Sequence, residues 1–489
     1  MAFSTAQADA QAALFKADFA KRDITPQIGS EAPGDYGKSY HKSIHDTSNV
    51  RAAVFDDGKT RVGIDALFIH RQTVTNVRKA IRDKTGIPGE AVLLAASHSH
   101  SSGPLAGVMP GEYDHAPLFV QKLAYEQTTC ADPKYLDRVE KAIIEAVCQA
   151  NEKRVEARAG VGKGREASVA FNRRFKMRDG RAITHPGQGK PDILEPAGPT
   201  DPDVGVLAAW DARGSCLDCV VNFACHATTS PGGISASYIC YLEKALQGFH
   251  GKDTVVVFLN GASGDVTQVD NRSPNKPPTG ERWAQLVGGR VGAEALKLTL
   301  GLERGELGPV DFRSQMLRIK RRAPAPERVK QCLELVQQLP AKVGATEWTF
   351  AKKIVLLDAQ LRKEAVVEVE VQAIQVGPAM FVTTPAEYFC QFGLDIKAGS
   401  PLPFTFPVSL ANGCVGYVPT EDAFGPNSGG YETRLTSYSN LEVSAGRQMA
   451  DAGVAMTKQL KPGTVPVPAK HLPFTGKPWS YGDVRPDLK

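Results

Sequence analysis

The sequence AVLLAASHSHSSGP, residues 91–104, decides the expected fold and the expected site. Residues 91–96 are an apolar run long enough for a strand that is buried on both faces, and Gly103 and Pro104 end the element. In an extended chain, His98 and His100 share one face, roughly 6–7 Å apart. They could hold a metal together, or one could hold it while the other transfers protons. The alternative is two polar residues at a strand end, although sites of α/β proteins gather at such ends.

The composition excludes several classes of function. The chain has 489 residues, of which 42% are hydrophobic and 23% are charged, values typical of soluble proteins. Its net charge of +5 is small for this length, and no basic block is interleaved with aromatic residues. Nucleic-acid binding is therefore not expected. No segment reaches the ~18 uninterrupted apolar residues of a membrane span.

The N-terminus and the cysteines leave the compartment open. Residues 1–13 contain small residues like those near a signal cleavage site, but lack the basic and hydrophobic regions of a signal peptide. The protein is secreted or periplasmic if a leader has been removed, and otherwise cytoplasmic. Nine scattered cysteines do not resemble a disulfide framework. Cys216 and Cys219 form a CxxC within a predicted strand, where they would point to opposite faces, so a structural pair is favoured over a redox or zinc pair.

An apolar strand followed by a polar residue recurs along the chain. Residues 216–225 end at His226, and residues 254–259 run into the glycine-rich turn NGASGDVT, which permits close backbone approach to a ligand. Residues 379–382 lead into Glu387, and residues 410–417 end at Tyr417. Further strands are predicted at 15–26, 204–210 and 365–376. Two more are predicted within 49–70, joined by a turn at Asp56-Asp57-Gly58. Helices are predicted at 72–85, from Asp132-Pro133 onward, and at 283–300, 325–339, 346–363 and 441–460.

His98, His226, Glu387 and Tyr417 would make a zinc set if they met in space, since zinc accepts imidazole and oxygen ligands. Each also has a purely structural interpretation. His226 could be a hydrogen-bonded core histidine, Glu387 a carboxylate at a helix N-terminus, and Tyr417 a packed aromatic residue. Spacing along the chain does not decide between them.

A series of motifs resembles the neutral/alkaline ceramidase family. It covers nearly all of residues 15–460 in family order. The motifs are DITP, HDxxxxRA (45–52), SHSHSSGP, FNRR (171–174), FACHATT, NGASGDVT, PAEYF (385–389), GYVPT (416–420) and YE (431–432).

The resemblance implies an α/β catalytic domain with one zinc ion, held by His98, His226, Glu387 and Tyr417. It also implies that His100 transfers protons, that Arg173 holds a polar group of the substrate, and that Tyr431 lies over the developing oxyanion. These roles suit amide hydrolysis. Zinc lowers the pKa of bound water to about 7 and polarises the carbonyl, and a histidine can protonate the leaving amine.

Three departures from the family affect substrate choice more than the metal. Thr267 stands where the family has a serine that is sometimes assigned as nucleophile, and Gln268 replaces the usual proline. A threonine can donate a hydrogen bond but is a poorer nucleophile in a tight site, so attack by zinc-bound water is favoured. The given sequence stops shortly after its last predicted helix, before the C-terminal β-sandwich domain expected from the family, and the loop after His100 reads SSGPLAG rather than SGPGG.

We therefore expect one large α/β domain over residues 1–460, with a mixed sheet flanked by helices and the site at strand ends, followed by a Pro/Lys-rich tail at 461–489. The expected function is zinc-dependent hydrolysis of an N-acyl bond in a ceramide or a smaller amide. The alternatives are a metal hydrolase acting on an ester, lactone or glycosidic bond, and a non-catalytic binding protein. The expected partner is a small or lipid-like substrate, and the oligomeric state is open.

Overall fold

The computed structural model describes residues 15–34, 37–56, 65–66 and 69–468, together with 473, 475–477, 479–482 and 484–489. Strand β12 (Val256–Asn260) shows how the sequence builds the layers. Successive side chains of a strand point to opposite faces. Val257 and Leu259 enter one hydrophobic core, whereas Val256 and Phe258 enter another. The strand is therefore buried on both faces.

A six-stranded sheet forms the first of two central layers, in the order β12-β11-β10-β5-β1-β2. Only β11 and β12 pair in parallel, so the sheet is mixed. Its other strands are β1 (Lys16–Asp23), β2 (Asn49–Asp56), β5 (Val155–Arg165), β10 (Asp203–Asp211) and β11 (Cys216–Phe223).

A four-stranded sheet, in the order β14-β15-β16-β18, packs against the first. The shared core between the sheets includes Phe381 and Phe406, whose ring centroids lie 5.5 Å apart. The strands are β14 (Val310–Lys320), β15 (Val366–Val376), β16 (Ala379–Thr383) and β18 (Phe404–Val408).

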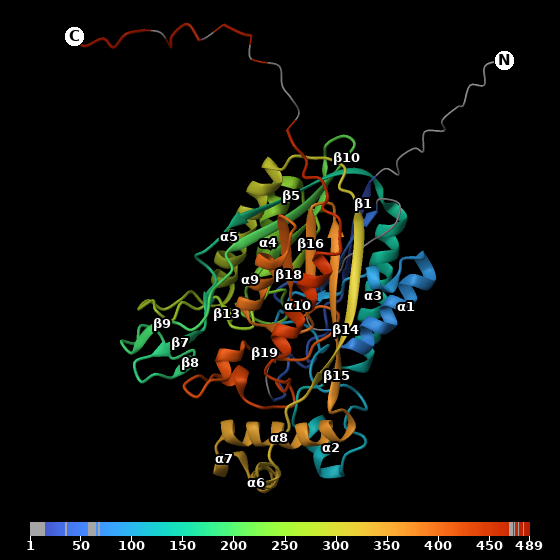
Figure 1. Cartoon of the computed structure of the whole chain (residues 1–489), viewed down its shortest axis with the longest axis vertical. Coiled ribbons are helices and arrows are strands. Elements are labelled where there is room, and N and C mark those ends of the chain that lie inside the picture. The colour runs from blue at the N-terminus through green and yellow to red at the C-terminus, as the bar shows by residue number, and fades with distance from the viewer. Residues whose placement is uncertain are drawn as a thin grey trace, which may run out of the picture.

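Helices cover the outer face of each sheet and complete four layers (Figure 1). The six-stranded sheet is covered by α1 (Arg71–Thr85), α3 (Pro133–Lys153), α4 (Tyr238–His250) and α5 (Gly280–Gly301). The four-stranded sheet is covered by α9 (Cys390–Gly399) and α10 (Ala445–Thr457). In α3, the side chain of Asp132 accepts a hydrogen bond from the Tyr135 amide, which caps the helix as predicted.

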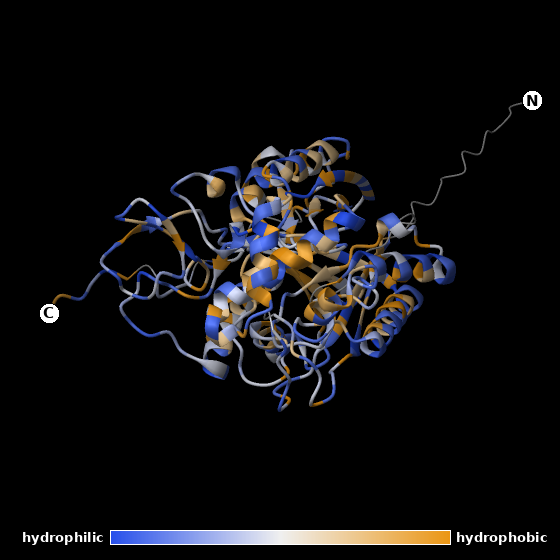
Figure 2. Ribbon diagram, turned by 90° about the horizontal axis from the view of Figure 1, so that it is seen from below, coloured by the Kyte–Doolittle hydropathy of each residue, from blue (hydrophilic) through white to orange (hydrophobic). Residues whose placement is uncertain are grey.

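Below the two sheets in Figure 1 lies a smaller unit with its own core, which we call the cap. It consists of the loop 104–131, with helix α2 (Leu118–Tyr125), and helices α6 (Pro326–Val336), α7 (Pro340–Val343) and α8 (Ala345–Lys363). Its core joins Val120 and Leu123 to Trp348 and Ile354. Figure 2, seen from the cap side, shows hydrophobic residues toward the centre and hydrophilic turns on the outer helix faces.

Short strands connect the loops around the site. They are β3 (Asp65–Ala66) with β4 (Ala95–Ala96), β6 (Phe171–Asn172) with β13 (Val266–Thr267), β17 (Glu387–Tyr388) with β19 (Tyr417–Val418), and the three strands β7 (Arg174–Met177), β8 (Ala182–Thr184) and β9 (Ile193–Pro196). Three 3-10 turns complete the description, at η1 (Gly89–Ala91), η2 (Glu421–Phe424) and η3 (Tyr431–Thr433).

The α/β class with helix-flanked mixed sheets is confirmed, with two principal sheets where one was expected. Most predicted helices are confirmed with small shifts, whereas α4, α9, β5 and β14 were not predicted. The predicted turn at Asp56-Asp57-Gly58 extends beyond the described residues. No helix in the described ranges combines the length and apolarity that a membrane crossing requires.

The prediction that Cys216 and Cys219 point to opposite faces is wrong. A β-bulge shifts the pairing of β10 and β11, so that Ala209 faces Asp218 while Trp210 faces Cys216. A bulge inserts one extra residue into a strand and reverses the alternation beyond it. Both cysteines therefore pack against the same core, and both are free thiols.

Candidate metal and catalytic site

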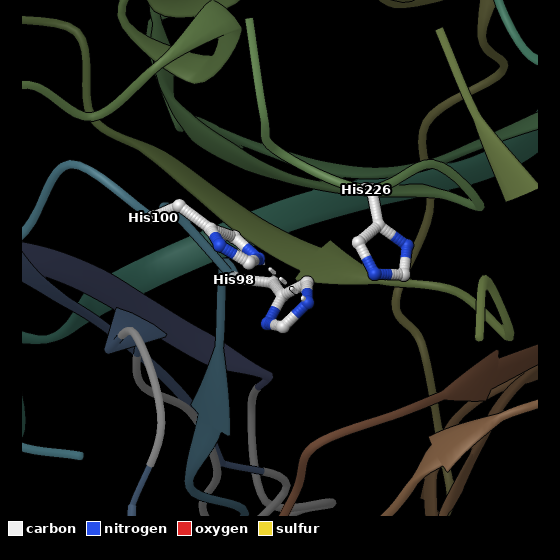
Figure 3. A group of neighbouring side chains, drawn as sticks. All are labelled: His98, His100 and His226. Atoms are coloured by element: carbon white, nitrogen blue, oxygen red, sulfur yellow. Dashed lines mark hydrogen bonds between the residues drawn. The ribbon is translucent and has the colours of Figure 1, made fainter. Parts of the chain in front are cut away.

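Two imidazoles and one carboxylate converge from three distant parts of the chain. His98 follows β4, His226 follows β11, and Glu387 begins β17. The Glu387 Oε2 atom lies 3.1 Å from the Nε2 atom of His226 and 3.3 Å from that of His98. His100 completes a group of three histidines whose nitrogens all lie within 4.8 Å of one another (Figure 3).

The geometry of the SHSH stretch differs from the extended chain that was expected. The strand predicted over residues 91–96 is present only at Ala95–Ala96, and His98 after it adopts a left-handed backbone conformation with φ of 64°. This conformation is uncommon for a residue with a side chain and is enriched at functional sites. The two rings meet edge to face with their Nε2 atoms 3.3 Å apart, closer than an extended chain would place them.

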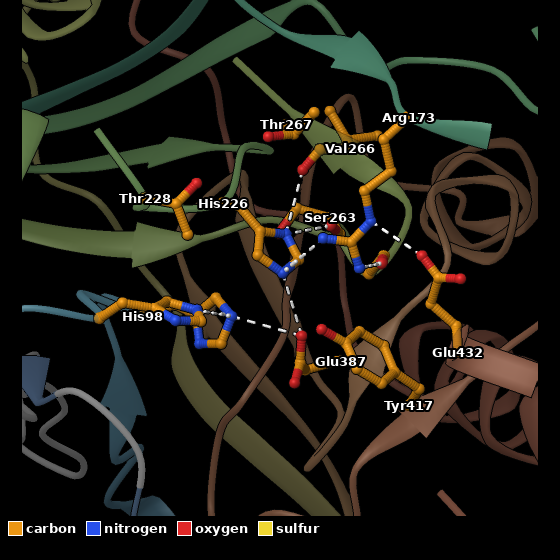
Figure 4. Close-up of polar contacts among 12 residues, drawn as sticks. His98, Arg173, His226, Thr228, Ser263, Val266, Thr267, Glu387, Tyr417 and Glu432 are labelled. Carbon is orange, nitrogen blue, oxygen red and sulfur yellow. Dashed lines mark hydrogen bonds and ion pairs between the residues drawn. The ribbon is translucent and has the colours of Figure 1, made fainter. Parts of the chain in front are cut away.

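The hydrogen bonds of His226 define which nitrogen faces the site. Its Nδ1 atom lies 2.7 Å from the carbonyl oxygen of Ser263 and 3.0 Å from that of Val266 (Figure 4). Because carbonyl oxygens only accept hydrogen bonds, Nδ1 carries the proton and donates it. Burial, reinforced by Arg173, lowers the pKa of His226 to about 4, so the ring is neutral near pH 7. Its Nε2 lone pair therefore points toward Glu387.

Glu387 is ionised at the same pH. Burial raises its pKa, but the neighbouring histidines lower it more strongly, to well below its usual range. The carboxylate oxygen Oε2 thus lies 3.1 Å from the Nε2 atom of His226, which also accepts a hydrogen bond from Arg173 over 3.2 Å. A cation held beside Oε2 and the imidazole nitrogens would be attracted to these electron-pair donors. Imidazole nitrogens fixed by a second hydrogen bond to backbone carbonyls are typical zinc ligands, so the residues present fit the metal.

Tyr417 is brought beside Glu387 by strand pairing. The two residues are direct partners in the parallel β17–β19 ladder. The hydroxyl of Tyr438 donates to the second carboxylate oxygen of Glu387 over 2.7 Å. The hydroxyl of Tyr417 lies 3.4 Å from that of Tyr431. Burial raises the pKa of Tyr417 well above its usual value, so the phenol keeps its proton unless a cation lies against its oxygen.

Arg173 lies behind these rings. Its guanidinium carbon is 5.1 Å from the ring centre of Tyr431 and 5.4 Å from that of Tyr417. The guanidinium donates to Glu432 over 2.9 Å, to the carbonyl oxygen of Gly264 over 2.6 Å, and to Nε2 of His226 over 3.2 Å. These internal partners favour a role in positioning the site. The expected role of Arg173, holding a substrate group, stays a prediction.

His100 is the third member of the histidine group and, like His98, lines a cavity. Burial, followed by the influence of His98 and His226, lowers its pKa well below the usual value. Gly34, at a φ of +108°, packs directly against the imidazole, and a Cβ atom there would collide with its Nδ1. The neutral ring can accept a proton before it donates one.

The glycine-rich turn supports the site from behind. A Cβ atom at Gly264 would overlap the backbone carbonyl of Glu387. The amide of Gly264 donates to the Tyr388 carbonyl over 2.8 Å. The close approach that was expected toward a ligand is therefore made to the strand that carries Glu387. Thr267 donates to Gln268 over 3.3 Å, and Figure 4 shows its side chain apart from the histidine group. Its predicted catalytic role stays a prediction.

A cavity of about 310 Å³ lies next to these residues. His98, His100, Glu387, Tyr417 and Tyr431 line it from the two-sheet body, whereas Thr128, Thr129 and Lys353 line it from the cap. Arg173, His226 and Thr267 are not among its described lining residues.

Comparison with solved structures identifies this architecture. A ceramidase complexed with C2 superposes with a TM-score of 0.66 at 17% sequence identity, over 94% of this chain and 77% of the other. The neutral ceramidase from Pseudomonas aeruginosa superposes with a TM-score of 0.66 at 19% identity, over 94% of this chain and 76% of the other. The fold is that of a neutral ceramidase. The resemblance predicted from the motifs is confirmed at this level.

Comparison of sequences alone does not detect the relationship to the ceramidase fold. No family model matches the chain, and no curated protein matches it significantly. Identity below one fifth, as here, is compatible with a shared fold and different substrates.

The sequence analysis missed two residues of the site. Tyr438 lies in a loop with no recognisable motif, and only its contact with Glu387 reveals it. Lys353 follows Lys352 on α8, and two adjacent lysines resemble a solvent-exposed helix face, yet both are buried. Glu432 was noted in the YE pair, but its ion pair with Arg173 was not foreseen.

Proposed function

We propose that this protein is a zinc-dependent hydrolase that cleaves an N-acyl (amide) bond, with zinc held by His98, His226, Glu387 and Tyr417. The observation that carries the proposal is the convergence of His98, His226 and Glu387, whose Oε2 atom lies 3.3 Å and 3.1 Å from the two imidazole Nε2 atoms. The neutral ceramidase fold supports the same reaction class by analogy. Zinc, when bound in such a site, lowers the pKa of water to about 7 and polarises a substrate carbonyl.

His100 is the proposed proton-transfer residue. Because its pKa is lowered, it is neutral near pH 7 and can first accept a proton from the attacking water. The imidazolium so formed then donates that proton to the leaving amine, which cannot depart as an anion. His100 lines the cavity, where the scissile bond must lie.

Tyr431 is the proposed donor to the developing oxyanion. Burial raises its pKa to about 12, so its hydroxyl remains protonated and able to donate. Arg173 and Glu432 fix it from behind, since Arg173 packs on the ring and is itself paired with Glu432. Donors held in advance of the reaction stabilise the charge without reorganisation.

The test combines metal analysis with a hydrolysis screen. We expect the purified protein to contain about one zinc per chain, and to cleave N-acyl amines in a manner that a chelator abolishes and added zinc restores. Parallel assays with esters, lactones and glycosides test the alternative bond types. Cleavage of one of those, with no amide cleavage, would replace the proposed reaction. Zinc binding with no hydrolysis of any class would favour a binding protein.

A further inference from the structure

The cavity at the site borders a second, larger chamber. The inner cavity measures about 310 Å³ and the outer one about 740 Å³. Four residues line both spaces, namely Gly107, Thr128, Lys353 and Tyr438. Three of the four belong to the cap, so the cap shapes the space into which a substrate extends from the site.

Lys353 brings a positive charge to this boundary. It lies on α8, next to side chains that form the cap core, and is only 8% exposed. Among the described residues that line the inner cavity, Lys353 is the one lysine or arginine. The one carboxylate in that lining, Glu387, is engaged by His98, His226 and Tyr438. Lys353 is therefore the charged side chain that the cap brings to the lining of the inner cavity.

Lys353 remains largely cationic near neutrality. Burial lowers its pKa to about 8, and the attraction of Glu112 opposes this effect. Keeping a charged ammonium group this deeply buried is unfavourable unless opposite charge compensates it. An anionic group of a bound ligand would supply further compensation at the cavity.

The outer chamber can take a polar end of a substrate. Its lining includes the charged residues Arg71, Glu112, Arg321, Glu364 and Glu370. They pair with one another, as Arg71 does with Glu370 and Arg321 with Glu364. An alkyl chain placed here would remove water from these groups without replacing its hydrogen bonds. A polar substrate end is accommodated without that penalty.

We propose that Lys353 is a specificity-determining residue, which selects amide substrates that carry an anionic group on the part lying toward the cap. The proposal rests on the proposed amide hydrolase function and deepens it. N-acylated amino acids are the simplest members of this substrate class, because a carboxylate follows the amide closely. An ammonium–carboxylate contact is a charge-assisted hydrogen bond, stronger than one between neutral groups.

The experiment compares substrates that share an N-octanoyl group and carry either an anionic or a neutral end; N-octanoylglycine and N-octanoylglycinamide are the near-isosteric pair. N-octanoylglycine and N-octanoyltaurine carry a carboxylate and a sulfonate, whereas N-octanoylglycinamide and N-octanoylethanolamine are neutral. The zinc-loaded wild type should prefer the anionic pair in kcat/KM. In Lys353→Met, kcat/KM for N-octanoylglycine should fall about 10- to 100-fold, the range for a hydrogen bond to a charged group. The neutral substrates should change little, and the two anions distinguish carboxylate from sulfonate recognition.

Two further variants serve as controls. Lys330→Met removes an exposed lysine from α6 of the same cap and should leave every rate unchanged. Lys353→Arg keeps the charge and should retain the preference for anions, even if Lys353→Met does not fold. Equal loss on neutral and anionic substrates in Lys353→Met, or no preference in the wild type, would overturn the proposal.

A binding measurement separates this proposal from the proposed function. If no amide is hydrolysed, titration calorimetry with intact N-octanoylglycine still tests the lysine. Binding by the wild type that is lost in Lys353→Met and kept in Lys353→Arg would support anion recognition without catalysis. Absent binding, or equal binding by all three proteins, would reject it.

Discussion

Two buried clusters of this protein are each centred on one glutamate but differ in the side chains that contact it. Between the six-stranded sheet and α4, Glu243 accepts from Arg51 over 3.1 and 2.8 Å and from Lys21 over 2.9 Å. Two cations thus enclose one carboxylate. At the site, by contrast, Glu387 faces two imidazole nitrogens, of which that of His226 presents a lone pair.

The pKa values follow from this difference. Although burial raises it, Arg51 and Lys21 lower the pKa of Glu243 to about 2, so this cluster is complete with its own residues. At the site, Arg173 is paired with Glu432 and donates to His226, whereas Glu387 itself contacts imidazoles and a tyrosine rather than lysine or arginine, and it lines a cavity. A buried cluster that is balanced internally contributes to the fold, whereas one that needs an added cation and opens to a cavity points to function.

The largest expected effect is the loss of zinc when a proposed ligand of the site cluster is replaced. His226→Ala removes a proposed ligand, so zinc should fall from about one per chain to near zero and hydrolysis to background. Metal analysis by plasma mass spectrometry measures this. His250→Ala is the matched control, because His250 pairs with Thr299 at the end of α4. Full zinc occupancy in His226→Ala would remove His226 from the ligand set.

The next effect separates proton transfer from metal binding. His100→Ala should lose about 10²–10⁴-fold in kcat, the usual contribution of a general acid or base. It should keep its zinc, because His100 is not among the proposed ligands. Steady-state kinetics and metal analysis of the same preparation give both values. Loss of zinc together with activity would assign His100 to the metal instead.

Substitutions in the Glu243 cluster should change the stability of the protein but not its activity. Glu243→Ala leaves Arg51 buried without its carboxylate and should reduce the free energy of unfolding by about 3–5 kcal/mol. Urea unfolding measures this, and the activity per folded molecule should not change. Glu145→Ala breaks a surface pair with Arg22 and should cost about 1 kcal/mol or less.

The stabilising contribution of the Glu243 cluster depends on pH. The pKa of Glu243 is lower in the folded protein than its ordinary value of 4.5, so its stabilising contribution is complete above pH 4.5. That contribution is lost as the pH falls from 4.5 toward 2. Glu243→Gln, which cannot titrate, should show a shallower loss of stability in this range. Parallel curves for the two proteins would contradict the assignment.

The smallest expected effect concerns Thr267. Its hydroxyl donates to Gln268, outside the described lining of the cavity, so Thr267→Ala should retain most of its turnover. Thr267→Ser, which restores the hydroxyl type of the ceramidase family, should gain little. An activity loss as complete as that of His226→Ala, or a trapped acyl-Thr267 species, would establish a covalent mechanism instead.

The sequence by itself determined the α/β class and the identity of most candidate site residues, whereas the second principal sheet was not expected. The continuous apolar run at 254–259 predicted a buried strand, and Asp132-Pro133 predicted the start of α3, because these signals are local. The motifs marked His98, His226, Glu387 and Tyr417, but that they act as zinc ligands stays a prediction. So does the single domain over residues 1–460.

Only the tertiary structure decided how these residues meet. The β17–β19 pairing sets Tyr417 beside Glu387, and a left-handed turn at His98 brings its imidazole against that of His100. Neither follows from periodicity, because strand pairing between distant segments depends on how the sheets pack. Lys353 is the clearest case, since its sequence suggests a solvated helix face. The packing of α8 within the cap buries it beside the cavity.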